Sequence, residues 1–316
     1  MTTRKVLIVT HGGNPAAVAA LDDAVAELTS AGFTPHLHND DDARSFGDKA
    51  TVDHIHANVS DAELVMVLGG DGSILRAAEL TYGTQVPILG VNLGHVGFLA
   101  ESERKNLHAV VGRIAAHDYT VEERTVAHVT VRRPVGHMGD GQVFEEITDW
   151  ALNEATIEKD VRQRLIEVGI EVDERPLSSF GCDGVIVATS TGSTAHAFSA
   201  GGPIMWPNLE GLLLVPLAAH ALFARPLVIG PTSTFRVTVL DRSPLPAVLA
   251  CDGRRTIDLP VGSVVDVRIG PRPLRFARLS AAPFTDRLVS KFSLPVIGWR
   301  EAAETAQAAA ATGRGG

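Results

Sequence analysis

The stretch VLGGDGSILRAA, residues 67–78, decides the fold of this chain. The apolar run ELVMVL that leads into it has the length of a strand, and SILRAAEL beyond the turn spaces its apolar residues as a helix does. Residues 69–72 are therefore predicted to form a tight turn between a strand and a helix. Such a turn presents backbone N–H groups at the positive end of the helix, and Gly69, Gly70 and Gly72 have no Cβ atom to keep a phosphate away. We expect an anion site here.

Asp71 is the unusual residue of this turn. The chain contains no Gly-Lys dipeptide, which excludes the Walker phosphate loop, and Leu75 stands where the dinucleotide-binding fingerprint has its third glycine. A carboxylate repels phosphate unless it holds a metal ion, accepts a proton from a reacting hydroxyl, or points away from the ligand. The structural alternative is that Asp71 caps the helix, a common position for aspartate.

The composition is that of an ordinary soluble protein of about two domains, with 316 residues, 45% hydrophobic and 21% charged. No apolar run approaches the roughly 20 residues of a membrane span, so no membrane partner is expected. The opening MTTRKVLIVTHGG lacks the features of a signal peptide, which favours a cytoplasmic location. A net charge of −9 argues against nucleic acid as a partner. Cys182 and Cys251 have no CxxC partner and are expected to be reduced thiols rather than zinc ligands.

The order of segments along the chain indicates two architectures. Strand-like and helix-like segments alternate from Lys5 to about His117, which predicts a parallel α/β sheet. The first helix should begin at Pro15, because Asn14 is a good N-cap and proline suits the first helical position. Beyond Tyr119 the segments are β-rich and separated by turn residues, which predicts a mostly antiparallel domain. We expect an α/β domain over 1–118, a β-rich domain over 119–300 and a tail, 301–316, that buries too little to be ordered.

Three stretches of the second domain are too polar or too rich in glycine for plain structure. ALNEATIE, residues 151–158, places Asn153 and Glu154 inside a strand-like run, where one of the two could be buried. GCDGVIVATSTGSTAHAFSAGGP, residues 181–203, crowds hydroxyls and backbone N–H groups into one loop, which suits the ribose and phosphate oxygens of a nucleotide. CDGRR, residues 251–255, repeats the Asp-Gly pair, and there a simple hairpin turn is a strong alternative.

Taken in order, GGDG after a strand, LNE, DG, TGSTA and SAGGP resemble the NAD kinase family, from about Val6 to Trp299. The GGDG turn alone would indicate only the superfamily shared with phosphofructokinases and diacylglycerol kinases. Asn153-Glu154 and TGSTAHAFSAGGP narrow the resemblance to NAD kinase, and the ending APFTDRLVSKFSLPVIGWR is similar to the actinobacterial branch. The resemblance implies a Rossmann-like α/β N-terminal domain followed by an NAD-binding, mostly antiparallel β domain.

The resemblance also implies a reaction and a set of site residues. Such enzymes transfer the γ-phosphoryl group of ATP to the 2′-hydroxyl of the adenosine ribose of NAD, which gives NADP, and polyphosphate is left open as an alternative phosphoryl donor. Asp71 matches the catalytic proton acceptor, and the turn glycines leave room for phosphates. Magnesium should accompany ATP, since the chain shows no dedicated metal cage, and the family forms homodimers or homotetramers. The substrate-binding positions implied are Gly69, Gly70, Asp71, Gly72, Arg76, Asn153, Glu154, Arg164, Asp183, Thr194, Ala195, His196, Ser199 and, less directly, Arg254.

Within that set, Asn153 and Glu154 should hold the adenine and ribose, and Asp183 the other ribose. The chain departs from the family pattern at two positions, with Ser190 in place of a proline and His196 in place of a tyrosine. Two alternatives remain open: a lipid or sugar kinase of the same superfamily, which would leave LNEATI and TGSTAHAFSAGGP unexplained, and a catalytically silent NAD-binding sensor.

Overall fold

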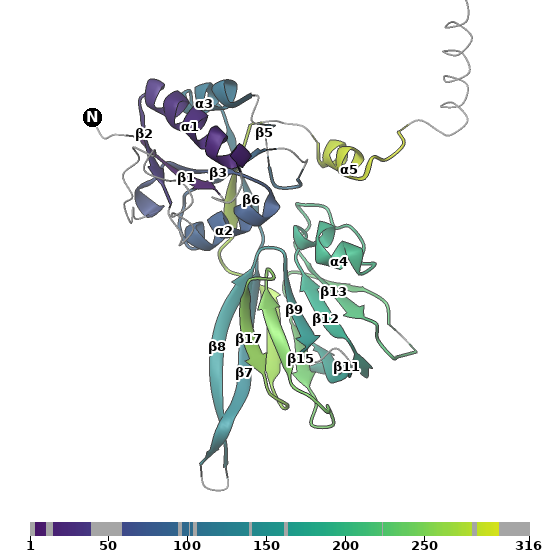
Figure 1. Ribbon diagram of the computed structural model, residues 1–316. Helices are drawn as coiled ribbons and strands as arrows, with labels where there is room; N and C mark the ends of the chain where they lie inside the picture. The colour runs from purple at the N-terminus through teal and green to yellow at the C-terminus, as the bar shows by residue number, and fades with distance from the viewer. Residues whose placement is uncertain are drawn as a thin grey trace, which may run out of the picture.

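The structure is a computed structural model that describes residues 4–10, 15–38, 59–93, 97–100, 102–103, 106–138, 141–160, 164–222, 224–279 and 283–296 (Figure 1). The tail expected at 301–316, together with Asn14 and Trp299, lies outside the described residues. No helix in the described ranges is both long enough and apolar enough to cross a bilayer.

The N-terminal part is built on a parallel sheet, as the alternating segments predict. Its strands follow the order β2 (Phe33–Leu37), β1 (Arg4–Thr10), β3 (Leu64–Leu68) and β4 (Ile88–Asn92), and the short β5 (Ser102–Glu103) also pairs with β4. Side chains of successive residues point to opposite faces of a strand. One face of the sheet therefore packs against α1 (Pro15–Ser30) and α3 (Leu107–Ala115), and the other against α2 (Asp71–Thr81). The predicted start of the first helix at Pro15 is confirmed.

Two strands from later in the chain complete this sheet. β19 (Leu274–Arg278) pairs in parallel with β4, and β6 (Thr120–Arg124) pairs antiparallel with β19. Both strands come from the range 119–300, so the chain leaves the first sheet after β6 and returns to it with β19. The return ties the two parts of the molecule together through backbone hydrogen bonds.

Between β6 and β19 the chain forms two antiparallel six-stranded sheets that pack face to face, which confirms the expected β-rich architecture. The first sheet has the order β11 (Arg175–Cys182), β10 (Ile166–Val172), β15 (Phe235–Val239), β18 (Val264–Ile269), β7 (Ala127–Met138) and β8 (Gly141–Ala151). The second has the order β14 (Leu227–Ile229), β13 (Leu212–Leu217), β12 (Gly184–Ala188), β9 (Glu154–Lys159), β16 (Ala247–Cys251) and β17 (Arg255–Leu259).

Cys182 and Cys251 both lie in the core between these two sheets as free thiols, as expected. Burial raises the pKa of the Cys182 thiol to about 12 and also raises the pKa of the Cys251 thiol. Both side chains therefore act as small apolar groups in the core.

The second sheet is covered on its other face by a short helical segment. η5 (Gly192–Thr194) and α4 (His196–Ser199) follow β12, and the buried Ala197 packs against Ile186 and Leu213 of the sheet. The C-terminal α5 (Phe284–Phe292) contacts α4 through the rings of Phe292 and Phe198, whose centroids lie 4.6 Å apart. Figure 1 shows α2, α4 and the start of β9 together at the junction of the two parts.

Candidate active site

Asp71 is the first residue of α2, directly after the glycine turn that follows β3. The N-cap residue is Gly70, and no side chain caps this helix, so the capping alternative for Asp71 does not hold. Its carboxylate instead accepts hydrogen bonds from the backbone N–H groups of Phe98 and Leu99, each at 3.4 Å. These bonds are long, because N–H···O distances in proteins centre on about 2.9–3.0 Å. The carboxylate therefore faces the segment that follows β4 and is held there weakly.

The glycines of the turn differ in what they permit. A Cβ atom on Gly69 would overlap the hydroxyl of Ser73, so this position accepts only glycine without a rearrangement. Gly70 and Gly72 are exposed, and within the described part of the chain nothing lies within 4 Å of a Cβ atom on either of them. The described residues therefore leave room for a ligand on the exposed side of the turn.

Asn153 and Glu154 form the corner between β8 and β9. Asn153 is half-buried, whereas Glu154 is only 7% exposed, and its Oε2 atom has no hydrogen-bond partner among the described residues. The backbone N–H of His196 at the start of α4 favours the charged form of this carboxylate. Burial, and next the nearby charge of Asp252, raise the pKa of Glu154 to about 8. The sequence predicted that either Asn153 or Glu154 could be buried, and the buried residue is Glu154.

The loop from Thr189 to Ser199 folds directly onto this corner. The N–H of Thr189 donates to the carbonyl of Asn153 at 2.9 Å, and a Cβ atom on Gly192 would overlap that same carbonyl. Ser193 is fully buried, and its hydroxyl accepts from the N–H of Met205 at 2.9 Å, which makes it structural. Of the predicted ligand contacts in this loop, Thr194 and Ala195 are half-buried, and His196 and Ser199 are exposed.

Asp252 belongs to the site although the sequence favoured a plain hairpin turn for its segment. The turn does join β16 to β17, with Asp252 at φ 53° and Gly253 at φ 65°, as Asp-Gly turns prefer. In addition, the buried carboxylate of Asp252 accepts hydrogen bonds from the N–H groups of Leu152 at 2.9 Å and Asn153 at 2.7 Å. A hairpin explains the Asp-Gly pair completely, so the sequence offered no separate signal for this second role.

Asp183 and Arg164 lie away from this corner. β12 pairs with β9 so that Ala188 is opposite Glu154 and Gly184 is opposite Glu158. At about 3.3 Å per residue, Asp183 is thus roughly a strand length, about 16 Å, from the Glu154 end. There its carboxylate pairs with the ammonium group of Lys159. Arg164, which is exposed, precedes β10 near the same end, since Ile166 pairs with Cys182.

The two remaining predicted contacts are arginines near α2. Arg76 is half-buried in the second turn of α2. Arg254 follows the Asp252 turn, and its Nε atom donates to Glu79 of α2 at 3.0 Å. The structure thus brings the glycine turn, the Asn153–Glu154 corner, the Thr194–Ser199 loop and Arg254 to one junction and leaves Asp183 and Arg164 outside it.

The donors at this junction bear on whether the site can take a divalent metal. Magnesium in phosphoryl-transfer sites is commonly bound by one or two carboxylates together with substrate phosphates. Asp71 offers one carboxylate beside an open glycine turn, and no group of three or more His, Cys, Asp or Glu side chains within the described ranges forms a metal cage. This donor set fits a metal ion that arrives with the phosphates of its ligand.

Family models match most of the chain. The ATP-NAD kinase N-terminal domain matches residues 18–119, and the ATP-NAD kinase C-terminal domain matches residues 152–279. The chain belongs to the NAD kinase family. NAD kinase from Leifsonia xyli is 53% identical over 302 residues, which are 94% of this chain and 97% of that protein. NAD kinase from Bifidobacterium longum subsp. infantis is 51% identical over 301 residues, which are 95% of this chain and 86% of that protein.

Solved structures of the NAD kinase family share the fold. Yeast NADH kinase complexed with NADH superimposes with a TM-score of 0.80 at 22% identity, covering 94% of this chain and 90% of that one. An NAD kinase from Archaeoglobus fulgidus in complex with ATP gives a TM-score of 0.70 at 24% identity, covering 92% of this chain and 100% of that one. The α/β domain followed by antiparallel sheets is thus the fold of NAD kinases. The close relatives, which are actinobacterial, make this chain an enzyme that phosphorylates NAD and decide against the lipid or sugar kinase alternative.

Proposed function

We propose that this NAD kinase transfers the γ-phosphoryl group of ATP to the 2′-hydroxyl of the adenosine ribose of NAD, with Asp71 as the group that orients the hydroxyl and accepts its proton. One observation carries the proposal: the carboxylate of Asp71 stands at the open glycine turn and takes no part in capping α2. Its two hydrogen bonds to Phe98 and Leu99 are long, so a hydroxyl can compete for the same oxygens.

The roles of the other residues follow from where they lie. The open faces of Gly70 and Gly72 receive phosphate oxygens, and the exposed turn lies at the N-terminus of α2, where the helix dipole favours negative charge. Asn153 and Glu154 hold the adenosine, and the orphaned Oε2 of Glu154 supplies a hydrogen-bonding atom that the protein itself leaves unused. Thr194, Ala195, His196 and Ser199 line the groove for the dinucleotide.

The order of proton transfer follows from the nature of the reaction. Phosphoryl transfer passes through a loose transition state in most analyses, so the attacking hydroxyl needs to lose its proton only late. Asp71 therefore contributes orientation first and proton acceptance second. Magnesium bound with ATP would neutralise charge on the transferring phosphoryl group, and the carboxylate of Asp71 at the glycine turn would help to hold it.

The role of Asp183 toward the second ribose depends on the assembly. Because Asp183 lies a strand length from Glu154, a ligand that contacts both must extend along β12, or a second copy of the chain must bring its own Asp183. We propose a homodimer or homotetramer, and light scattering of the purified protein measures this state directly.

The experiment that tests the function uses purified protein with magnesium, NAD and either ATP or polyphosphate. NADP is followed with an NADP-specific dehydrogenase. We expect NADP with ATP, and the polyphosphate reaction measures donor preference. If the folded protein binds NAD by calorimetry but forms no NADP with either donor, the protein is a silent NAD-binding sensor. That result would contradict the proposal.

A further inference from the structure

The two halves of the proposed site come from different parts of the molecule. Asp71 begins α2 in the parallel-sheet part, whereas Asn153 and Glu154 form a corner of the β-sandwich. Phosphoryl transfer demands that both be fixed relative to each other, since a misplacement of about 1 Å can cost about 10²-fold in rate. The contacts between α2 and the corner therefore bear on catalysis directly.

Apolar packing brings the two halves together. Leu152, beside the corner, is buried in one cluster with Ile74 and Ala77 of α2. At the other end of α2 the ring of Tyr82 stacks on the ring of Trp150, with 4.2 Å between the centroids and 20° between the planes. The apolar burial around Leu152 is not directional, so it holds the two parts in contact without setting their exact register.

Arg255, the first residue of β17, makes directional contacts to both halves. Its Nη1 atom donates to Glu79 of α2 at 2.6 Å, and its Nε atom donates to Asp149 of β8 at 3.0 Å. Its Nη2 atom donates to the carbonyl of Trp150, and the guanidinium carbon lies 4.8 Å from the centroid of the Trp150 ring. One rigid planar group thus connects the helix of Asp71 to the strand that leads into the corner.

The same side chain reaches the residue that shapes the corner. Nη2 of Arg255 lies 3.6 Å from Oδ2 of Asp252, whose side chain is 2% exposed. Asp252 in turn accepts the N–H groups of Leu152 and Asn153, and its own N–H donates to the carbonyl of Glu154 at 2.9 Å. Asp252 therefore fixes the corner by three hydrogen bonds, and Arg255 ties that arrangement to α2.

We propose that Arg255 is a positioning residue for phosphoryl transfer, which fixes α2, and with it Asp71, against the Asn153–Glu154 corner. The inference rests on the proposed function. Glu79 lies eight residues from Asp71, about 12 Å along one helix at 1.5 Å per residue, so a displacement at Glu79 moves the start of the helix. Lysine cannot replace Arg255 in this role, because one ammonium group lacks the planar fork that serves several acceptors at fixed angles.

The test compares Arg255→Lys, Glu79→Gln and the double variant with the wild-type protein. For each, kcat and KM are measured with saturating ATP, the NAD affinity by calorimetry, and the melting temperature in the same buffer. For Arg255→Lys we expect kcat to fall by about 10- to 100-fold while the NAD Kd changes by less than about threefold. The double variant should lose no more than about twofold beyond the larger single loss, because Glu79 is the residue of α2 to which Arg255 donates.

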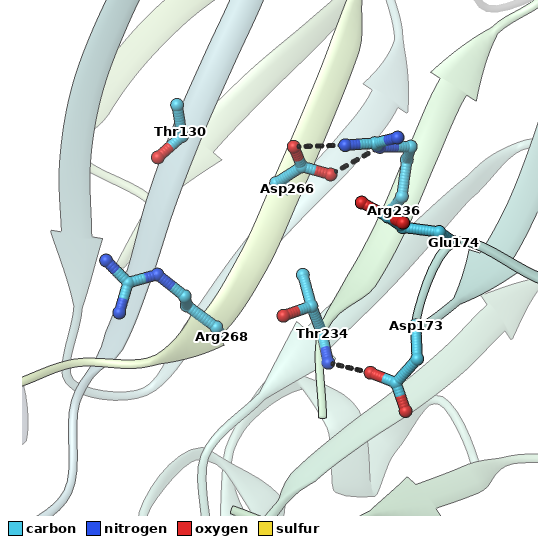
Figure 2. Close-up of a pocket in the computed structure, with 7 residues that line it drawn as sticks. All are labelled: Thr130, Asp173, Glu174, Thr234, Arg236, Asp266 and Arg268. Carbon is cyan, nitrogen blue, oxygen red and sulfur yellow. Dashed lines mark hydrogen bonds and ion pairs between the residues drawn. The ribbon is translucent and has the colours of Figure 1, made fainter. Parts of the chain in front are cut away.

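Arg236 provides a matched control. It forms a two-point pair with Asp266 at 2.7 and 2.9 Å, from the neighbouring strands β15 and β18, and its side chain is 36% exposed against 27% for Arg255. Figure 2 shows this pair with Thr130 and Arg268 beside it on the other sheet. These residues line a hollow of about 510 Å³ on the outer face of that sheet. Arg236→Lys also replaces a paired guanidinium with an ammonium group, but away from the junction. It should leave kcat within about twofold of wild type, a smaller loss than the one expected for a positioning residue.

The proposal is overturned if folded Arg255→Lys keeps a kcat within twofold of wild type, or loses no more than Arg236→Lys does. It is also overturned if the loss of kcat equals the fraction of protein that is unfolded at the assay temperature, since the role is then structural. If Arg255→Lys does not fold, Glu79→Gln decides by the same criteria, with Arg254→Lys as its control because Arg254 also donates to Glu79. Absence of NADP formation by the wild-type protein is a different result and contradicts the proposed function itself.

Discussion

Gly97 and Asp71 touch across the junction between β4 and α2, so closely that a Cβ atom on Gly97 would overlap the carboxylate of Asp71. Gly97 precedes Phe98 and Leu99, whose N–H groups donate to that carboxylate. Position 97 therefore requires glycine because the side chain of Asp71, 26 residues earlier, occupies the space of a Cβ atom. The φ angle of Gly97 is not the reason, since it does not lie in the left-handed region. The direction of the Asp71 carboxylate is set by this contact.

Gly97→Ala should lower kcat by about 10²-fold, because the added methyl group forces the carboxylate or the 97–99 segment to move by about 1 Å. The measurement is steady-state NADP formation. Gly112→Ala is the control, since Gly112 lies in α3 with no described residue within 4 Å of an added Cβ atom, and alanine there should leave kcat unchanged and raise stability. Equal activity of the two variants would show that the position of Asp71 tolerates displacement.

Asn153→Ala and Glu154→Ala should raise the KM for NAD more than the KM for ATP. Both residues belong to the corner proposed to hold the adenosine, which lies on the β-sandwich side of the junction, whereas the glycine turn proposed to bind phosphates lies at the start of α2. The measurement is the pair of KM values for each variant. A change confined to the KM for ATP would move the corner to the phosphate donor's side.

Glu154 should make the stability of the ligand-free protein depend on pH. Its pKa is raised from 4.5 to about 8, first by burial and next by Asp252, with a further contribution from Glu158. Between these values the unfolded chain has released a proton that the folded chain retains, so stability is present below about pH 4.5 and is lost as the pH rises to about 8. Asp252, whose pKa burial also raises, contributes in the same direction.

Glu154→Gln removes the ionisable group while keeping its shape. The melting temperature of the variant should therefore fall less than that of the wild-type protein between pH 5 and pH 9, by scanning calorimetry. Parallel curves for the two proteins would mean that Glu154 ionises in the folded state as it does in the unfolded chain.

His196→Tyr tests the departure from the family pattern. His196 is exposed at the start of α4. The tyrosine ring is larger than imidazole and stacks over more area, and its hydroxyl can donate a hydrogen bond. We expect His196→Tyr to lower the KM for NAD or leave it unchanged at pH 8. A KM for NAD that rises in the variant, measured at saturating ATP, would contradict a ligand-facing position for residue 196.

The sequence allowed much of this architecture to be predicted, because the deciding signals are local. The strand, glycine turn and helix around Asp71 follow from periodicity and from the glycines, and the start of α1 follows from its proline. The return of β19 to the first sheet could not be read from local patterns, since its antiparallel partner β6 lies about 150 residues away. Sheet membership depends on which apolar faces meet, which spacing within a strand does not reveal.

The candidate site likewise contains residues that local sequence patterns indicate and residues that they do not. Residues within one motif, such as Asn153 and Glu154, were found because polar side chains interrupt an apolar run. Asp252 was missed because its turn already satisfies the Asp-Gly pattern. Asp183 stands in the same motif as His196, but the intervening strand carries it to the opposite end of the sheet. Neighbours in sequence share a site only when no strand separates them.

Asp71→Asn tests the central claim most directly. The amide keeps the size of the carboxylate and cannot accept the proton of the ribose hydroxyl, so kcat for NADP formation should fall by about 10²- to 10⁴-fold, the usual worth of a positioned acid or base. The NAD Kd, measured by calorimetry on the same preparation, should remain within a few-fold of the wild-type value. A kcat that also stays within a few-fold of wild type, with unchanged NAD affinity, would contradict the assignment of Asp71 as the proton acceptor.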